Sequence, residues 1–262
     1  MVDAWSPAVY ERFKQERTRP FLDLLELIEQ DRLERAIDLG CGTGELTALA
    51  AERLGVTAMT GLDSSPAMLD EARSRVRPGL AFELDDIEPW TSGGDADLVL
   101  ANASLQWVPN HAQVLRRWTA GLAPGGQIAV QVPANADHPS HLVAAHLASS
   151  SEFVDDFPDG VPPDAVAANV LRPEDYAVLL YELGYDRRHV RLQVYGHVLD
   201  STEAVVDWVS GTTLTRFRRV LPEARYETFV RRYRDELLAV LGERSPYFYP
   251  FKRILMWGRL PG

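Results

Sequence analysis

The sequence feature that most constrains the fold is a glycine-rich run between a predicted strand and a predicted helix. The apolar residues 36–39 lead into Gly40-Cys41-Gly42-Thr43-Gly44, and a helical pattern starts at Leu46. Glycine adopts positive φ angles and, without a Cβ, lets a ligand lie against the backbone. In doubly wound sheets, a turn of this kind after the first strand binds the ligand. The run therefore predicts an α/β fold with a ligand site at this turn, although glycines alone also fit a purely structural turn.

The order of elements along the chain supports this fold class. Apolar runs predict further strands at 58–62, 80–84, 96–101 and 127–132. Helical patterns fill the gaps at 46–54, 65–75 and 111–122. Strands that alternate with helices imply right-handed crossovers and a parallel sheet. We therefore expect a doubly wound, Rossmann-like core.

Beyond Pro133 the alternation of strands and helices loosens. Residues 149–163 are polar, acidic and proline-containing, which predicts a mobile loop or cap. Later helices are predicted at 173–183, 202–209 and 223–241, and later strands at 188–198 and 253–257. We expect one domain over 1–262, made of lid helices (1–30), a ligand-binding core (31–133), and a substrate cap with the C-terminal strands (134–262).

The charge of the chain limits its partners. The net charge is −11 at pH 7, so we expect neither nucleic acid nor an anionic membrane as a partner. A small anionic substrate would need its own arginines. Cys41 is the single cysteine, which excludes an internal disulfide and, with no signal-peptide pattern at the start, predicts a cytoplasmic protein. We expect a monomer or homodimer without a bound metal.

A nicotinamide dinucleotide fold is the main rival for the glycine run. Its fingerprint is GxGxxG, but the third glycine position is held here by Glu45, and the extra glycine is Gly44. An acidic residue at the helix start would repel a pyrophosphate. The run favours a ligand without phosphate, while a non-catalytic binding protein stays open as an alternative.

Acidic residues end the next two predicted strands. Asp63 follows the second strand, where a carboxylate can accept both ribose hydroxyls of an adenosine. Asp86 follows the third, where it can accept the adenine amino group while Ile87 packs on the ring. Taken singly, Asp63 also fits a helix-capping role and Asp86 a solvated loop. Together with the glycine turn, these acids predict a nucleoside site.

The runs Asp-Leu-Gly-Cys-Gly-Thr-Gly, Gly-Leu-Asp-Ser-Ser-Pro-Ala-Met-Leu and Asp-Asp-Ile resemble those of class I S-adenosylmethionine-dependent methyltransferases. The resemblance implies a seven-stranded sheet, mostly parallel with an antiparallel last strand, and S-adenosylmethionine as cofactor, which leaves as S-adenosylhomocysteine. The cofactor-binding residues predicted in this way are Asp38, Gly40, Gly42, Gly44, Asp63, Ser64, Met68, Asp86, Ile87 and Asn102.

Several further stretches resemble the narrower family of trans-aconitate 2-methyltransferases. They are Trp5–Tyr10, Arg17–Pro20, Asp63–Met68, Ala101–Trp107 with its run Asn-Ala-Ser-Leu-Gln-Trp, Ala129–Pro133, Val206–Val209 and Arg253. This resemblance implies transfer of a methyl group to a carboxylate of trans-aconitate or a similar di- or tricarboxylic acid. A natural-product C-, N- or O-methyltransferase stays open as an alternative, because the cofactor motifs are shared.

A carboxylate acceptor suits a sequence that offers no convincing general base. A carboxylic acid with a pKa near ~4 is already ionised at neutral pH, so the protein has to position the acceptor and exclude water. We assign no acid or base; Gln106 and Tyr10 are candidates for positioning, and His111 is expected at a helix start on the surface. The predicted substrate-binding residues are Tyr10, Arg17, Gln106, Trp107, His141, Arg216 and Arg253.

Overall fold

The structure of the chain, a computed structural model, describes residues 14–31 and 33–262, with side chains from Thr18 onward. The chain divides into two compact units. The sheet unit comprises Thr18–Pro133, Asn169–Gln193 and Arg253–Gly262, and the helical unit contains Ala134–Ala168 and Val194–Lys252. The single domain expected over 1–262 stays a prediction.

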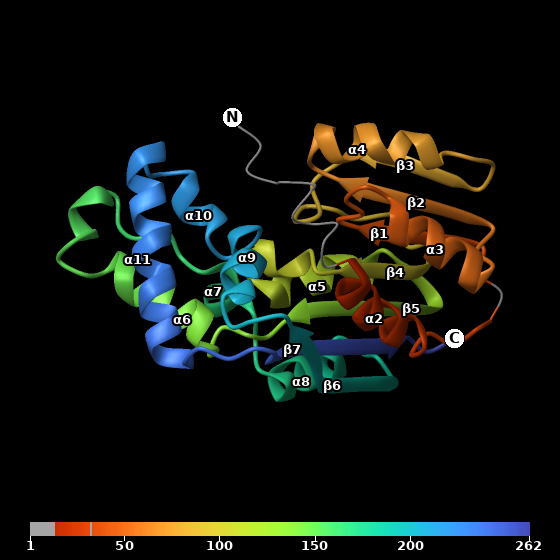
Figure 1. The fold of residues 1–262 in the computed structure, drawn as a ribbon. Helices are drawn as coiled ribbons and strands as arrows, with labels where there is room; N and C mark the ends of the chain where they lie inside the picture. Colours follow the sequence, from red (N-terminus) through yellow and green to blue (C-terminus); the bar gives the residue numbers. More distant parts are fainter. Residues whose placement is uncertain (1–13, 32) are drawn as a thin grey trace. The chain divides into compact units, whose positions relative to one another are not determined.

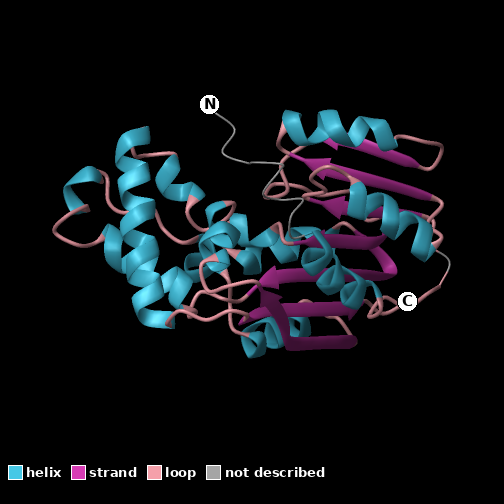
Figure 2. Cartoon of the chain, viewed as in Figure 1, coloured by secondary structure: helices cyan, strands magenta, loops and turns pink. Residues whose placement is uncertain are grey.

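The sheet has seven strands in the order β3-β2-β1-β4-β5-β7-β6 (Figures 1 and 2). Its strands are β1 (Arg35–Leu39), β2 (Ala58–Asp63), β3 (Leu80–Leu84), β4 (Ala96–Asn102), β5 (Leu122–Pro133), β6 (Arg187–Leu199) and β7 (Tyr247–Arg259). Strands β1 to β5 pair in parallel, while β7 is antiparallel to β5. This order and direction confirm the predicted α/β fold with its antiparallel last strand.

The order of the strands also assigns the helices to opposite faces of the sheet. Right-handed crossovers that step from β1 to β2 and β3 put α3 (Glu45–Leu54) and α4 (Pro66–Ala72) on one face. The step from β4 to β5 runs the other way, so α5 (His111–Ala120) covers the opposite face. The segments that follow the carboxyl ends of β1 and β4 therefore lead to opposite faces, and such sheets bind ligands at this reversal.

Local signals explain where α4 begins and where α3 ends. Ser65 caps α4 by accepting a hydrogen bond from the N–H of Met68, with Pro66 at the first helical position. Helix α3 ends at Gly55, whose φ of 63° suits a left-handed cap.

The remaining elements of the sheet unit are α2 (Lys14–Leu25), the 3-10 helices η1 (Arg73–Arg75) and η2 (Leu105–Trp107), and α8 (Pro173–Glu182).

Two strands are longer than the sequence predicts. Strand β5 begins at Leu122, five residues early, because Ala96 of β4 pairs with Leu122 before a shift in register. Strand β7 begins at Tyr247, six residues before the predicted start at Arg253, and includes Pro250. At β5, pairing with β4 overrides the local turn signal.

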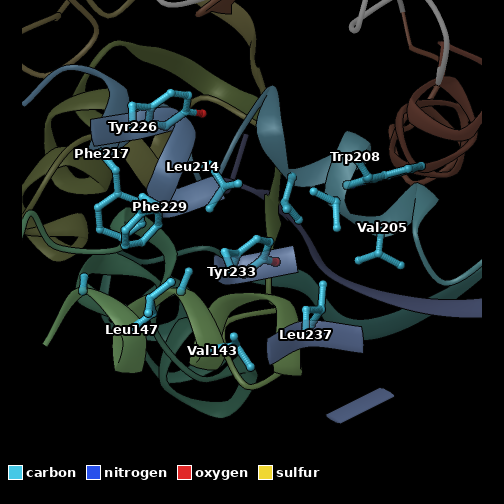
Figure 3. Close-up of a cluster of buried hydrophobic side chains, with 14 of the residues drawn as sticks. Val143, Leu147, Val205, Trp208, Leu214, Phe217, Tyr226, Phe229, Tyr233 and Leu237 are labelled. Carbon is cyan, nitrogen blue, oxygen red and sulfur yellow. The ribbon is translucent and has the colours of Figure 1, made fainter. Parts of the chain in front are cut away.

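The helical unit is built on an apolar cluster of its own (Figure 3). Its helices are α6 (Pro139–Ala148), η3 (Val154–Asp156), α7 (Ala165–Asn169, which ends on the first residue of the sheet unit), α9 (Ala204–Ser210), α10 (Thr215–Arg218) and α11 (Glu223–Leu241). Phe229, Tyr233 and Leu237 line one side of α11 and are fully buried in this cluster. Their spacing of four residues gives α11 the apolar face that packs into the cluster.

The segment predicted as a mobile loop, 149–163, packs into that cluster. Phe153 and Phe157 are buried, and the Phe153 ring meets Phe229 edge-on with centroids 5.1 Å apart. The sequence does not predict α6, because the helix carries apolar residues on all sides and lacks the polar face that marks a surface helix. In the part of the chain that the structure describes, no helix is long and apolar enough to span a bilayer.

Candidate functional site

The glycine loop after β1 is shaped by the residues packed beneath it. Gly40 has a φ of 84°, and a Cβ on it would lie 2.3 Å from the Cβ of Ser104. A Cβ on Gly44 would lie 2.5 Å from the Phe82 ring. A Cβ on Gly42, at φ 56°, would meet no atom within 4 Å. Packing inside the protein therefore requires Gly40 and Gly44, while Gly42 borders open space that a ligand can occupy.

Asp63, at the end of β2, holds this loop in place through hydrogen bonds. Its Oδ2 accepts the N–H of Gly42 at 2.8 Å, and its Oδ1 accepts the N–H of Ser65 at 2.9 Å. Each carboxylate oxygen has a second lone pair free for another donor. Asp63 can thus hold the loop and accept ribose hydroxyls at the same time, so its capping role and its proposed ligand role are compatible.

Asp38 lies beneath the loop. It is buried, and its Oδ2 accepts a hydrogen bond from the Thr47 hydroxyl at 2.6 Å. Burial raises the pKa of Asp38 to about 7, the Thr47 hydrogen bond lowers it, and the charge of Asp63 raises it further. A positively charged ligand at the loop would favour the ionised form of Asp38, so its proposed part in cofactor binding is electrostatic.

Cys41, within the loop, has no features of a nucleophile. Burial raises the pKa of the thiol well above its usual value, and the carboxylates of Asp38 and Asp63 raise it further. The thiolate, which is the reactive form, is therefore disfavoured. Cys41 therefore fills space in the loop.

The end of β3 carries the predicted adenine-binding pair. Asp86 is exposed, and its Oδ1 accepts the N–H of Glu88 at 2.9 Å. The side chain of Ile87 is buried, and its carbonyl accepts the indole N–H of Trp118 on α5 at 2.9 Å. The backbone at Ile87 is therefore held in place, while the Asp86 carboxylate keeps room for a further donor.

The end of β4 is strained and rich in polar groups. Ala103 has a φ of 55°. This left-handed backbone conformation is energetically unfavourable for any residue that carries a side chain. Ser104 donates to the Leu39 carbonyl at 2.5 Å, which ties β4 to the base of the glycine loop. The Oδ1 of Asn102 is buried, and no described residue hydrogen-bonds to it. Strain and unpaired polar atoms cluster at functional sites, and Asn102 therefore stays a proposed ligand.

The two residues predicted next to Asn102 as substrate ligands differ in burial. Gln106 is buried and donates through Nε2 to the Ala103 carbonyl at 2.6 Å, while its Oε1 has no partner among the described residues. Asn169 donates to the Gln106 carbonyl at 2.9 Å. Trp107 is exposed. Gln106 is thus held in position, while about half of the Trp107 surface (49%) is exposed.

The expectation that His111 lies on the surface is wrong. It begins α5, but the side chain is 2% exposed and its Nδ1 lies 2.6 Å from the Tyr176 hydroxyl. Burial lowers the pKa of His111 to about 4. The imidazole is therefore neutral near pH 7. Because Tyr176 lies on α8, its contact with His111 packs α8 against the start of α5.

Arg253 on β7 is buried beside a glutamine that the sequence analysis does not single out. Its Nη1 donates to the Oε1 of Gln131 on β5 at 3.3 Å. In the strand register, Gln131 pairs with Asn102 of β4, and Arg253 pairs with Pro133 of β5. The sheet therefore brings Asn102, Gln131 and Arg253 to neighbouring positions at one end.

A second polar group lies inside the helical unit. Asp164 Oδ2 lies 2.8 Å from His141 Nδ1 and 3.0 Å from Arg216 Nη1. Burial raises the pKa of Asp164, but the hydrogen bond and charge of His141 and the charge of Arg216 outweigh it and lower the pKa to about 2. The structure thus joins two predicted substrate residues through an acid that the sequence analysis missed.

The structure leaves some predicted residues outside these groups. Ser64 is exposed and Met68 is half-buried, both near the Asp63 turn. Tyr10 and the side chain of Arg17 lie outside the described residues. No group of three or more His, Cys, Asp or Glu side chains within the described ranges is arranged to hold a metal ion.

The ends of β1, β2 and β3 together form a set suited to one elongated ligand. Gly42 offers open backbone, Asp63 and Asp86 offer carboxylate acceptors, and Ile87 offers apolar surface. This set suits an uncharged sugar and base joined to a cationic group, because a phosphate would meet carboxylates in place of donors.

Comparison with known proteins agrees with this geometry. Residues 36–126 match the model of a family described as a methyltransferase domain. The chain is 40% identical over 262 residues to a trans-aconitate 2-methyltransferase of Streptomyces avermitilis, covering 97% of this chain and 96% of that protein. It is 39% identical to one of Deinococcus radiodurans, with 98% of both chains covered, and 36% identical to one of a Mycobacterium species, with 97% and 99% covered.

Solved structures share the fold at low sequence identity. A putative methyltransferase of Bacillus halodurans superposes with a TM-score of 0.59 at 14% identity, covering 93% of this chain and all of that one. Phosphoethanolamine N-methyltransferase 2 of Haemonchus contortus, solved with S-adenosylhomocysteine, superposes with a TM-score of 0.57 at 16% identity, covering 93% of this chain and 53% of that one.

Proposed function

The chain belongs to the trans-aconitate 2-methyltransferase family, and from this we propose that it transfers a methyl group from S-adenosylmethionine to a carboxylate of trans-aconitate. The observation that carries the proposal is the 36–40% identity to such enzymes over nearly the full length of both chains. The products are the monomethyl ester and S-adenosylhomocysteine.

The cofactor supplies a methyl group on a cationic sulfur, which an oxygen nucleophile attacks in line. In the proposed complex, Asp63 accepts the ribose hydroxyls, Asp86 and Ile87 bind the adenine, and Gly42 lies against the methionine part. Asp38, beneath the loop, adds negative charge near the sulfonium. These roles are supported by the open space beside Gly42 and by the unshared lone pairs of Asp63.

The acceptor needs no general base. A carboxylate with a pKa of about 4 is ionised at neutral pH, so no proton is transferred in the step. Formation of the new C–O bond breaks the C–S bond and neutralises both the carboxylate and the sulfonium. His111 is buried and neutral, which agrees with a reaction in which the protein orients the acceptor and excludes water.

The proposed acceptor ligands of each unit are cations and neutral donors. Arg253 in the sheet unit stays a proposed ligand of a carboxylate, which arginine binds with two parallel hydrogen bonds. In the helical unit, Asp164 orients Arg216 and His141, which stay proposed substrate ligands. Gln106 stays a proposed positioning residue. A cytoplasmic location and a monomeric or homodimeric state stay proposals from the sequence.

The direct test is an acceptor panel. Purified protein is incubated with S-adenosylmethionine labelled in the methyl group and with trans-aconitate, cis-aconitate, citrate, itaconate, a primary amine or a phenol. We expect kcat/KM to be highest for trans-aconitate and the label to be released by mild base, as an ester requires. Transfer to the amine or phenol without transfer to any acid would contradict the proposal.

A further inference from the structure

Two glutamines on β5 differ in the hydrogen bonds that their side-chain amides make. Gln127 and Gln131 lie four residues apart, so both side chains are on the same face of the strand. Both are 1% exposed in a strand that is otherwise apolar between them. A polar amide in such a strand needs hydrogen-bond partners on both its oxygen and its nitrogen.

Gln127 has partners on both ends of its amide. Its Oε1 accepts the N–H of Glu29 at 2.9 Å and the indole N–H of Trp257 at 2.9 Å. Its Nε2 donates to the Glu29 carbonyl at 3.1 Å. Gln127 therefore has a structural role that explains its presence in the strand.

Gln131 has a partner on only one end. Its Oε1 accepts from Nη1 of Arg253 at 3.3 Å, whereas its Nε2 is buried without a hydrogen-bond partner among the residues that the structure describes. The orientation of this amide is settled by chemistry, because a guanidinium only donates and must face the oxygen. Among the described residues, the amide nitrogen of Gln131, which carries two N–H donors, is therefore the end without a hydrogen-bond partner.

The neighbourhood of that nitrogen belongs to the proposed active site. Gln131 pairs with Asn102 across β4 and β5, and its carbonyl accepts the N–H of the strained Ala103. The guanidinium of Arg253 touches the same amide. Gln131 is neutral, so its contact adds no negative charge beside Arg253, as an aspartate or glutamate there would.

We propose that Gln131 is a substrate-binding residue that determines acid specificity: its Nε2 donates to a carboxylate that Arg253 also binds. The amide oxygen orients the guanidinium, and the amide nitrogen completes the donor set for an anion. The inference rests on the proposed function, because it assigns a residue to the acceptor site of that reaction.

Two substitutions of Gln131 test the assignment. Gln131→Met keeps the length of the side chain and removes the donor, and Gln131→Glu keeps an oxygen for Arg253 but replaces the donor with a charged acceptor. Loss of one hydrogen bond to a charged group is expected to raise KM for trans-aconitate about tenfold or more, and the glutamate to raise it further. The KM for S-adenosylmethionine is expected to stay within about twofold of wild type.

Gln127→Met is the matched control. It removes hydrogen bonds that are satisfied within the protein, so we expect a lower melting temperature with an unchanged KM for trans-aconitate. Calorimetry of trans-aconitate binding to each S-adenosylhomocysteine-bound protein separates acid binding from turnover, and it remains a readout if one of the Gln131 variants folds poorly.

Wild-type activity separates this inference from the proposed function. If the wild type methylates no acid, the proposed function fails first. If the wild type methylates trans-aconitate, but both Gln131 variants bind the acid as the wild type does, or lose cofactor affinity in place of acid affinity, the assignment of Gln131 is overturned.

Discussion

The carboxylate of Asp63 accepts the backbone N–H of Gly42 at 2.8 Å, so the end of β2 holds the glycine loop that follows β1. The other oxygen accepts the N–H of Ser65 at the start of α4. One side chain therefore connects two strand ends and a helix start, and it fixes the loop before any ligand binds. Preorganisation of this kind lowers the entropic cost of binding.

Asp63→Asn is expected to weaken S-adenosylmethionine binding by roughly 100-fold, because its two oxygens both serve donors and an asparagine can serve only one of them. The amide nitrogen would then face a backbone N–H. Isothermal titration calorimetry measures the loss, with Asp70→Asn, an exposed acid on α4 paired with Arg73, as the control that keeps wild-type affinity. An affinity within twofold of wild type in Asp63→Asn would show that Asp63 has no role in binding.

Gly42→Ala separates the two functions of glycine in the loop. The positive φ costs an alanine roughly 1–2 kcal/mol in stability, but the new methyl group enters open space. Gly55→Ala is the matched control, with a φ of 63° and nothing within 4 Å at the end of α3. We expect similar melting temperatures for both variants and a loss of cofactor affinity only in Gly42→Ala. Equal affinities would mean that no ligand occupies the space beside Gly42.

Asp38 makes the stability of the protein depend on pH. Its native pKa of about 7 lies above the unfolded value of 3.8 because of burial. The native state therefore holds the proton more tightly, and the stability contributed by protonated Asp38 is full below about pH 4 and is lost as pH rises to about 7. The difference amounts to about 4 kcal/mol.

Asp38→Asn is expected to flatten the dependence of the unfolding free energy on pH between about 4 and 7, while Thr47→Val, which removes the hydrogen bond that lowers the pKa, extends that window upward. Urea denaturation at a series of pH values provides the measurement. If Asp38→Asn keeps the wild-type slope, the Asp38 carboxyl is not the group responsible.

Asp164→Ala is expected to destabilise the protein by about 3 kcal/mol, because it leaves Arg216 and His141 buried without their shared acid. Asp156→Ala breaks a more exposed pair with Arg225 and is expected to cost less than about 1 kcal/mol. The native pKa of Asp164 is below the unfolded value of 3.8, so its contribution is present above about pH 4 and is lost as pH falls towards 2. Similar losses for both variants in urea denaturation at pH 7 would contradict this.

The cofactor half of the site is predictable from the sequence because its signals are local. The glycines that form the loop stand in one short run, and Asp63 and Asp86 each end an apolar strand. Strand ends converge at one edge of a parallel sheet, so the position of each residue along the chain is enough to place it.

The other buried polar groups, in either unit, depend on contacts between distant parts of the chain. Asp164 lies in a stretch with no helical or strand pattern before it, and its partner Arg216 is far along the chain. His111 is buried by Tyr176 of α8, which nothing near His111 indicates. Gln131 did leave a signal, since it and Gln127 are the polar residues in the apolar run 127–132, but the sequence does not say which amide is satisfied.

The account is tested most directly by identifying the product made from trans-aconitate and S-adenosylmethionine carrying a deuterated methyl group. Mass spectrometry and NMR of the purified product are predicted to show a single deuterated methyl ester on one carboxyl, with one equivalent of S-adenosylhomocysteine. A protein that binds the cofactor and leaves trans-aconitate unmodified, while the label appears on a carbon or nitrogen of another acceptor, would contradict it.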